Sequence, residues 1–448
     1  MAVLVPPAAA TDLLQAWHAA LAHDKGHAVD SAGHAAAQSR REQASSLWRP
    51  QVGLTAGVGL STHETDTQGA QFSAPGFGQS GGVGFATSVS QGASARWAVG
   101  ATMPLYNPER RARQQQLNLS VDAADLEWQA AAQGLMLRTA ERYFDVALAE
   151  EAVQVLERQR QAVQRAATEA QDRFQLGAVP VTDTHEARAR LAGLQAQRLA
   201  ADSDLQNKRA VLADSTGLPP DSLRTQLPAG AQVPVALTPL EQWLVEAQAG
   251  NPAVRGQRLA LEVARQEAAR YSRAASASVE LVAQAGRDRL SGSGDFGAAG
   301  NSATTRLVGI QLLVPLYSGG YRSARQDEAL KLVDKAAAEV ERSSQQVAQQ
   351  VRAAWRGLSV GQERLRAMEE ALAATLSRAD ATRTGRDVGQ RTTLDLLNAE
   401  NDAAAARLAL AQARVALLLD RLRLSALVGR LDEAALRAAN AELTPRQP

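Results

Sequence analysis

The stretch Met103-Pro104-Leu105-Tyr106 returns as Val314-Pro315-Leu316-Tyr317, an offset of 211 residues (315 − 104). A second landmark, Leu176-Gly177, returns as Val388-Gly389 with an offset of 212 residues (389 − 177). Landmarks this far apart that keep nearly one offset indicate that the chain contains two copies of one long unit. We therefore divide it into a first repeat at 1–217, a linker at 218–239, a second repeat at 240–430 and a C-terminal tail at 431–448. We expect the tail in the equatorial region, around the middle of the long helices.

Composition excludes several classes of function. The 448 residues carry 48 Lys and Arg against 47 Asp and Glu, a net charge of +1, and the basic residues are spread along the chain. This pattern does not favour a nucleic-acid-binding surface. Cysteine is absent, which excludes disulfides, thiolate metal sites and cysteine nucleophiles. We find no Ser-His-acid or paired-carboxylate arrangement and expect no enzyme activity.

The N-terminal region and the apolar segments bear on targeting. The sequence contains no run of about 18 apolar residues, so it predicts no transmembrane helix. Met1 leads directly into an apolar segment without an Arg- or Lys-led signal sequence, so we expect a processed form of an exported protein. No Cys near the N-terminus offers a lipid anchor.

Proline-free segments predict very long helices. No Pro occurs from Glu109 to Val179 or from Leu316 to Thr444, and a Pro inside a helix costs about 3 kcal/mol. Small and apolar residues recur from Leu330 to Leu372 at alternating spacings of three and four, as in a coiled coil. A helix over 318–386 would span roughly 100 Å, so we expect an elongated molecule. A simple coiled-coil stalk is the alternative.

Glycines and prolines predict where these helices turn. Gly177 and Pro180 end the first long helix, Gly385 and Gly389 end the second, and further helices follow at 182–214 and 393–427. Both long helices therefore form helical hairpins. The segments 11–48 and 237–275 are also helical by pattern.

Four segments of strict alternation predict strands. They begin near Val52, Trp97, Val279 and Val308, and each has about ten residues of alternating apolar and polar or small side chains. That length and pattern suit a tilted strand of an outer-membrane barrel, although a soluble antiparallel sheet also alternates. We expect long polar loops at 61–95 and 286–305. Four strands cannot close a barrel, so a membrane barrel requires oligomerisation, and a trimer would supply 3 × 4 = 12 strands.

Two stretches at the predicted hairpin turns carry a family resemblance. Residues 388–400 (VGQRTTLDLLNAE) and 174–183 (FQLGAVPVTD) resemble the two turns of the TolC family of outer-membrane factors, and the similarity extends over about 11–429. The resemblance implies an α+β membrane protein: a trimeric 12-stranded outer-membrane β-barrel, four strands per chain, continued by a long α-helical coiled-coil tunnel across the periplasm.

The same resemblance implies a gate at the hairpin turns. Thr182 and Asp183 match acceptors on one hairpin, and Arg391 matches their partner on the other, because Arg–carboxylate pairs hold neighbouring hairpins together. Asp395 matches a carboxylate of the constriction, where threefold repetition makes an acidic ring. This sequence departs from the family at two positions: Asn398 replaces a second Asp, and Arg386 replaces a Tyr. We expect a single acidic ring and a pairing of Arg386 with Asp183.

The turn residues would also contact a periplasmic adaptor in such a protein. They are Gly177, Ala178, Val179, Val388, Gly389 and Gln390. A passive export channel of this kind needs an inner-membrane ABC transporter or other pump, and no cofactor or nucleic acid.

Three hypotheses of function follow. The first is an outer-membrane exit duct for type I secretion of a protein such as a toxin, as in CyaE-like components, which the missing lipid anchor slightly favours. The second is the outer-membrane component of a multidrug or small-molecule efflux pump. The third is a soluble periplasmic coiled-coil scaffold or adaptor.

Two weaker motifs do not change these hypotheses. Four histidines cluster on the N-terminal helix: His18, His23, His27 and His34. His23 and His27 are one helical turn apart and could share a zinc ion, but the catalytic Glu of such a site is missing. We expect no metal. Residues 292–297 (GSGDFG) match G-x-G-x-x-G but lie between two predicted strands, where a phosphate-binding loop would have to open a helix.

Overall fold

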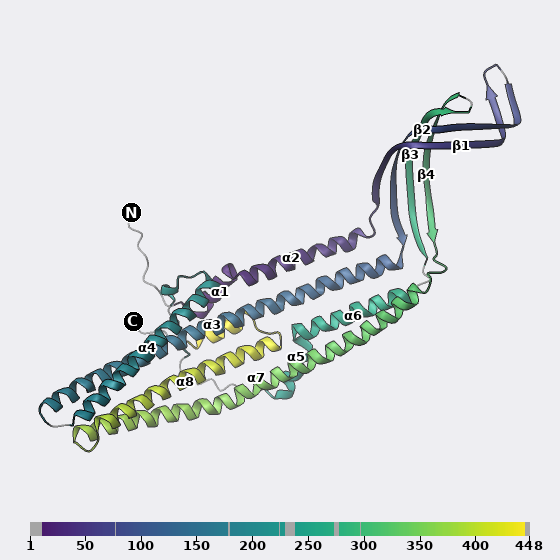
Figure 1. The fold of residues 1–448 in the computed structure, drawn as a ribbon. Helices are drawn as coiled ribbons and strands as arrows, with labels where there is room; N and C mark the ends of the chain where they lie inside the picture. Colours follow the sequence, from purple (N-terminus) through teal and green to yellow (C-terminus); the bar gives the residue numbers. More distant parts are fainter. Residues whose placement is uncertain are drawn as a thin grey trace. The chain divides into compact units, whose positions relative to one another are not determined.

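The computed structural model forms two compact units, and each draws on both halves of the sequence. The helical unit comprises 1–37, 122–261 and 335–448, and the sheet unit comprises 38–121 and 262–334. The element order α–α–β–β–α–α occurs twice along the chain (Figure 1). The structure describes residues 11–76, 78–177, 180–223, 225–228, 238–272, 277–295 and 297–443.

The sheet unit contains one antiparallel sheet in the order β1-β2-β3-β4 (Figure 1). All four strands are longer than the ten residues that alternation predicted. Their bounds are β1 Gln51–Ala74, β2 Gly78–Tyr106, β3 Ser278–Gly294 and β4 Gly297–Leu313.

The predicted loops at 61–95 and 286–305 are therefore wrong for most of their length. Their residues continue the strand ladders, with His63 opposite Val89 and Arg287 opposite Thr304. Backbone hydrogen bonds hold a strand ladder together even where neither face is apolar. The polar composition of these two segments therefore led to a wrong prediction of loops. β4 ends at Leu313, two residues before Pro315, because Pro315 has no N–H to donate to a strand ladder.

The register gathers most of the apolar residues of the four strands on one face of the sheet. Leu54 lies opposite Val99, Val99 opposite Ala285, and Leu281 opposite Ile310. The other face is rich in Gly, Thr and Gln and also carries Val282, Leu307 and Leu313. The apolar face is open, since Val58 is 89% exposed. Its members are Val52, Leu54, Ala56, Val58, Leu60, Trp97, Val99, Ala101, Met103, Val279, Leu281, Ala283, Ala285, Val308, Ile310 and Leu312.

Long helices dominate the rest of the chain, as the proline-free segments predicted. The long helix expected at 318–386 is confirmed as α7, and 393–427 is confirmed as α8. The segments at 11–48 and 237–275 are each two helices, because the chain leaves helical geometry at Asp24 and Asn251. Among the described residues, no helix has an apolar stretch long enough to cross a membrane. The bounds are α1 Leu13–His23, α2 Lys25–Ser46, α3 Pro108–Gln175, α4 Val181–Thr216, α5 Leu240–Gly250, α6 Pro252–Ser272, α7 Tyr321–Asp387, α8 Thr393–Leu427 and α9 Glu433–Ala441.

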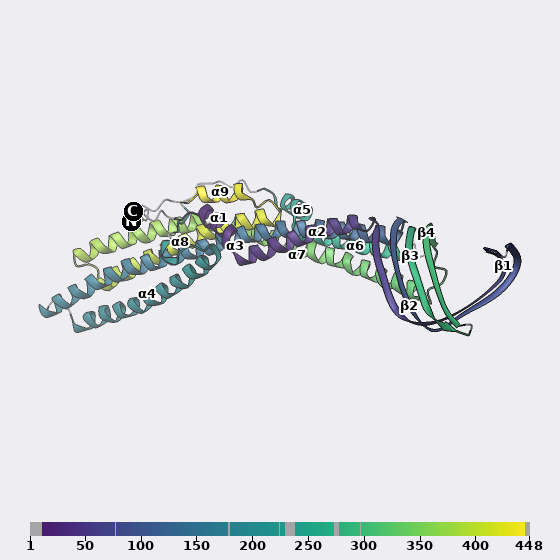
Figure 2. The ribbon, with the colours of Figure 1, turned by 90° about the horizontal axis from the view of Figure 1, so that it is seen from above.

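The largest core of the helical unit joins the two ends of the chain. Trp17 of α1 and Leu436 of α9 pack with Tyr143 and Phe144 of α3. Figure 2 shows α9 next to α1. The buried Tyr143 hydroxyl donates to the Thr11 carbonyl at 3.1 Å and accepts from the Gln226 N–H at 2.9 Å. One side chain thus fastens both the N-terminal segment and the segment that links the repeats.

Candidate functional site

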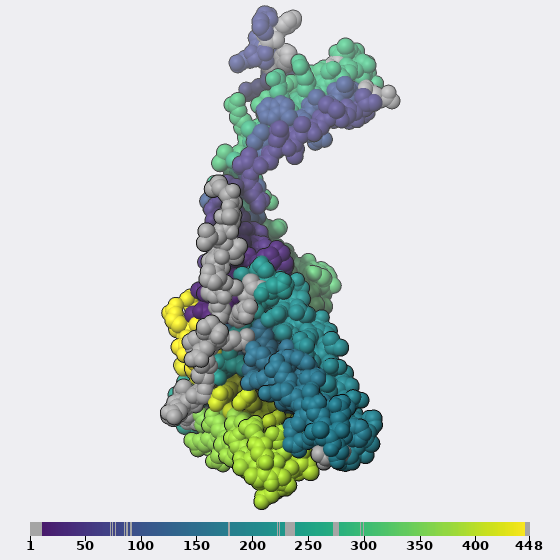
Figure 3. Space-filling model, turned by 90° about the vertical axis from the view of Figure 1, so that its left-hand side faces the viewer, coloured from purple at the N-terminus to yellow at the C-terminus, as the bar shows by residue number. Residues whose placement is uncertain are grey.

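Two helical hairpin turns lie side by side at one end of the helical unit (Figure 3). Each contains a glycine in the left-handed conformation, Gly177 at φ 73° and Gly389 at φ 78°, a geometry that side chains with a Cβ disfavour. At the second turn the Gln390 N–H donates to the Gly385 carbonyl at 2.7 Å, which ends α7.

The turns expose apolar side chains. Leu176 is 84% and Val388 is 66% exposed, and both lie next to the turn glycines. Ala178 and Val179, two of the residues expected to contact an adaptor, lie outside the described residues. The remaining expected turn residues lie where the sequence placed them, at the ends of α3 and α7.

Asp395, expected at the constriction, lies in the first turn of α8, three residues after the N-cap residue Thr392. Its carboxylate accepts from the Thr392 N–H at 3.0 Å, and the Thr392 hydroxyl accepts from the Asp395 N–H at 3.0 Å. The two residues form a capping box. The hydrogen bonds from Thr392, aided by the charge of Arg391, lower the pKa of Asp395, so the carboxylate stays charged at the exposed start of α8.

An ion pair and a hydrogen bond connect the two hairpins. Arg386 of α7 lies 3.5 Å from Glu169 of α3, measured from Nη1 to Oε2. Arg190 of α4 donates through Nη1 to Oδ1 of Asn398 on α8 at 2.6 Å. Beneath these contacts Leu397 packs in a small buried cluster with α3 and α4, whose other buried members are Val163, Ala166 and Leu194.

The expected pairings with Asp183 do not occur within the described part of this chain. Arg386 pairs instead with Glu169 and with its neighbour Asp387, at 2.9 Å. The reason is position: Arg386 ends α7 beside the last turns of α3, whereas Asp183 lies in the first turn of α4. Neither does an ion pair join Arg391 to Asp183 among the described residues. Thr182 contacts Asp183 only marginally, at 3.5 Å.

A small cavity of about 150 Å³ lies between the two hairpins, and Asp183 is the predicted site residue that lines it. Asp183 and Arg190 line it from α4, and Leu397 of α8 and the N-cap residue Thr392 line it from the other hairpin. Sequence reasoning placed Asp183 near the turns but did not single out Arg190 or, nearby, Glu169. Nothing in the sequence distinguishes these two from other charged residues on exposed helix faces.

The N-terminal histidines pack against neighbouring side chains. His27 and His34 both stack on Trp128 of α3, with ring centroids 4.9 and 5.5 Å away. His34 also contacts Asp125 at 2.7 Å. Where the structure describes the chain, no three His, Asp or Glu side chains are arranged to hold a metal ion.

Known proteins resemble this chain over most of its length. The Outer membrane protein TolC of Vibrio cholerae is 28% identical over 395 residues, which cover 88% of this chain and 85% of that protein. The Alkaline protease secretion protein AprF of Pseudomonas aeruginosa is 28% identical over 342 residues, which cover 75% and 70%.

Solved structures show the same fold. The outer membrane protein VceC of Vibrio cholerae superimposes with a TM-score of 0.71 at 18% identity, covering 93% of this chain and 96% of that one. The CmeC outer membrane channel of Campylobacter jejuni has a TM-score of 0.73 at 15% identity, covering 96% and 90%. The fold is therefore the α+β fold of outer-membrane channels.

The family model described as "Outer membrane efflux protein" matches residues 17–218 and 243–430. Together with the relatives, this match confirms the TolC-family resemblance and assigns the chain to the bacterial outer membrane, from which it extends into the periplasm. It also argues against a soluble scaffold. The chain belongs to the outer membrane efflux protein family.

Proposed function

We propose that this protein is the outer-membrane exit duct of a tripartite machine for type I secretion of a protein such as a toxin, gated at its helical hairpin turns. The observation that carries the proposal is the combination of an open apolar sheet face with two adjacent helical hairpins. The apolar face suits lipid, and the Gly-, Thr- and Gln-rich face suits an aqueous lumen. The duct performs no catalysis of its own.

A trimer accounts for the open sheet. One chain supplies four strands, and the smallest bacterial barrels have eight. Three chains would give 12 strands and a closed barrel, which satisfies the backbone groups at the edges of β1 and β4 within the membrane. Repetition about the threefold axis would also convert Asp395 into a ring of three carboxylates, each fixed by its capping box.

A periplasmic adaptor and an inner-membrane ABC transporter are the expected partners. The exposed Leu176 and Val388 give each chain two apolar contacts for an adaptor at the turns. An inner-membrane partner would supply the energy, because nothing in the described residues resembles a nucleotide site.

The relatives favour protein cargo but also support a second candidate. AprF is named as an alkaline protease secretion protein, and PrtF of Dickeya chrysanthemi is named as a proteases secretion protein. BepC of Brucella suis, 28% identical over 282 residues, is named as an outer membrane efflux protein. Efflux of small compounds is therefore the second candidate.

Single-channel recording in planar bilayers tests the gate. Detergent-purified wild-type protein should give small, stable, cation-sensitive conductance steps. Arg391→Ala, alone or with Arg386→Ala, should raise the conductance, because Arg386 pairs with Glu169 across the two hairpins and the family resemblance assigns Arg391 to a contact between neighbouring hairpins. Unchanged conductance in both variants would remove these residues from the gate.

Cargo requires a different experiment. The gene should be deleted in its host and the culture supernatant compared with the wild type for secreted protein, alongside sensitivity to toxic dyes and detergents. Loss of one secreted protein with unchanged dye sensitivity supports secretion. The opposite result would establish efflux.

A further inference from the structure

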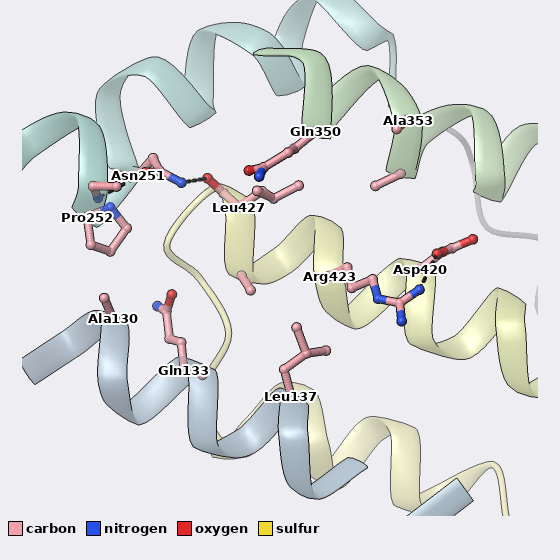
Figure 4. A pocket seen from close by; sticks show the side chains of 14 residues that line it. Ala130, Gln133, Leu137, Asn251, Pro252, Gln350, Ala353, Asp420, Arg423 and Leu427 are labelled. Atoms are coloured by element: carbon pink, nitrogen blue, oxygen red, sulfur yellow. Dashed lines mark hydrogen bonds and ion pairs between the residues drawn. The ribbon is translucent and has the colours of Figure 1, made fainter. Parts of the chain in front are cut away.

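The charged residues that line a cavity of about 580 Å³ in the helical unit balance each other (Figure 4). They are Asp420 and Arg423, which are hydrogen-bonded to each other at 3.1 Å. The cavity wall therefore favours neither a cation nor an anion. A charged ligand is favoured where like charges lie close together without opposite ones, and the sheet unit has such a place.

Three exposed arginines lie on the apolar face of the sheet. Arg306 of β4 lies opposite Ala285, a member of that face. Arg287 of β3 lies opposite Trp97, another member, and Arg289 follows two residues later on the same strand. Residues directly opposite each other in a ladder point to the same side, as do alternate residues of one strand. All three arginines therefore share the apolar face.

This face has no carboxylate to compensate the arginines. Its rows that start at residues 52–60 of β1 and run across to β4 contain no Asp or Glu. Among the described residues the arginines form no ion pair, and Arg287 donates through Nε to the Ser302 hydroxyl at 3.0 Å. The opposite face differs, because its Arg96 lies opposite Asp288. The apolar face thus carries three uncompensated positive charges.

The three arginines are close enough to share one anionic group. Arg287 and Arg289 are two residues apart on one strand, so their Cα atoms are about 7 Å apart. Arg306 is a diagonal neighbour of Arg287, at about 7–8 Å. Each guanidinium can donate two parallel hydrogen bonds to a phosphate. Together they would form a site for a phosphate group at an apolar surface.

The level of these residues on the strands fits the outer boundary of a membrane. Arg289 is ten residues (289 − 279) from Val279 at the other end of β3, about 34 Å along the strand. A tilt of about 40° reduces this to about 26 Å of height, close to the apolar band of about 25 Å in outer-membrane barrels. Trp97, 48% exposed, belongs to a residue type that marks such boundaries.

The boundary near Arg289 is the one that faces the cell exterior. The opposite ends of the strands lead into the long helices, which extend into the periplasm. Arg306 lies one row deeper than Arg287 and two rows deeper than Arg289, and its long side chain can reach outward to the boundary while its stem stays in apolar surroundings.

We propose that Arg287, Arg289 and Arg306 bind the phosphate groups of lipopolysaccharide, the lipid of the external leaflet of the outer membrane. Its lipid A part carries phosphates directly above the acyl chains, which matches arginines at the edge of an apolar band. This inference rests on the lipid-facing assignment of the sheet in the proposed function, and it adds the chemical class of lipid that the sheet binds.

Fluorescence anisotropy of labelled lipid A with detergent-purified full-length protein tests the proposal. Labelled lipid A without its phosphates is the uncharged comparison. The wild type should bind lipid A at least about tenfold more tightly than the dephosphorylated form. The triple variant Arg287→Gln, Arg289→Gln, Arg306→Gln should lose this preference. The matched control Arg96→Gln, on the opposite face of the same strands, should keep it.

Replacement of all three arginines by Lys separates charge from structure. This variant keeps three cations and should retain most of the preference, whereas a loss equal to that of the Gln variant would overturn the proposal. Equal affinity of the wild type for both lipids, or an equal effect of Arg96→Gln, would also overturn it. Failure of the wild type to insert into phospholipid vesicles without lipopolysaccharide would instead overturn the lipid-facing assignment itself, so the two failures are distinguishable.

Discussion

Glu169 and Arg386 form an ion pair of 3.5 Å between the last turns of α3 and α7, although they are 217 residues apart in sequence (386 − 169). The pair connects the two hairpins of one chain directly beside their turns. Arg386 is also held by Asp387, so its guanidinium is oriented on both sides.

Glu169→Gln should make the closed arrangement less stable. A partly exposed ion pair contributes up to about 1 kcal/mol, which corresponds to about a fivefold change in the open population. Conductance in planar bilayers should therefore rise by up to that factor. Glu363→Gln is the matched control, because it breaks an exposed pair with Arg366 within α7 alone. Equal conductance of the two variants would exclude Glu169 from the gate.

Asn398→Asp should have the opposite effect. The Arg190 guanidinium already donates to Asn398 at 2.6 Å, and a carboxylate in the same place would make that hydrogen bond charge-assisted and stronger. We expect lower conductance and greater block by multivalent cations, since the trimer would gain three carboxylates. Arg190→Ala in the Asn398→Asp background should reverse the lower conductance but leave the cation block.

Leu54→Arg and Thr55→Arg test the assignment of the two sheet faces. Leu54 lies on the apolar face and Thr55 on the opposite face of the same strand. Arg on the lipid face costs about 2–4 kcal/mol near the membrane midplane, so Leu54→Arg should reduce folding into lipid vesicles. Thr55→Arg should fold normally. Equal folding yields would contradict the lipid-facing assignment.

Tyr143→Phe should destabilise the helical unit by about 1–3 kcal/mol. The buried hydroxyl bonds Thr11 and Gln226, and its loss leaves a buried carbonyl and a backbone N–H without a partner. The temperature of unfolding, followed by circular dichroism, should fall. Stability equal to the wild type would show that water replaces the hydroxyl.

Glu157 should make the α3–α4 hairpin sensitive to acid. Hydrogen bonds from Arg160 and Gln161 lower the pKa of Glu157 to about 2, from 4.5, and Arg198 of α4 pairs with it at 3.2 Å. A lowered pKa means that the charged carboxylate stabilises the fold above about pH 4.5 and that this contribution is lost as the pH falls toward 2.

Unfolding of wild type and Glu157→Gln at several pH values checks this sign. The wild type should be the more stable at pH 6, and the difference should shrink between pH 4.5 and 2. A difference that stayed constant over this range would assign the stabilisation to packing of the side chain instead of its charge.

The sequence by itself determined the repetition, the long helices and the apolar face. The Pro-free segments that reach the turns at Gly177 and Gly389 leave few alternatives to helical hairpins, and alternation around Leu54 or Ile310 specifies which side chains share a face. These are local properties, since helix and strand geometry set which residues lie together along one element.

Tertiary structure decided the rest. Alternation could not show that the strands continue past Ser61, because backbone pairing with β2 sustains them there. The motif around Asp395 could not show that Arg386 meets Glu169 or that Arg190 meets Asn398, since these contacts join segments about 200 residues apart. Which charged side chains meet depends on how four helices pack, and no spacing along the chain encodes that packing.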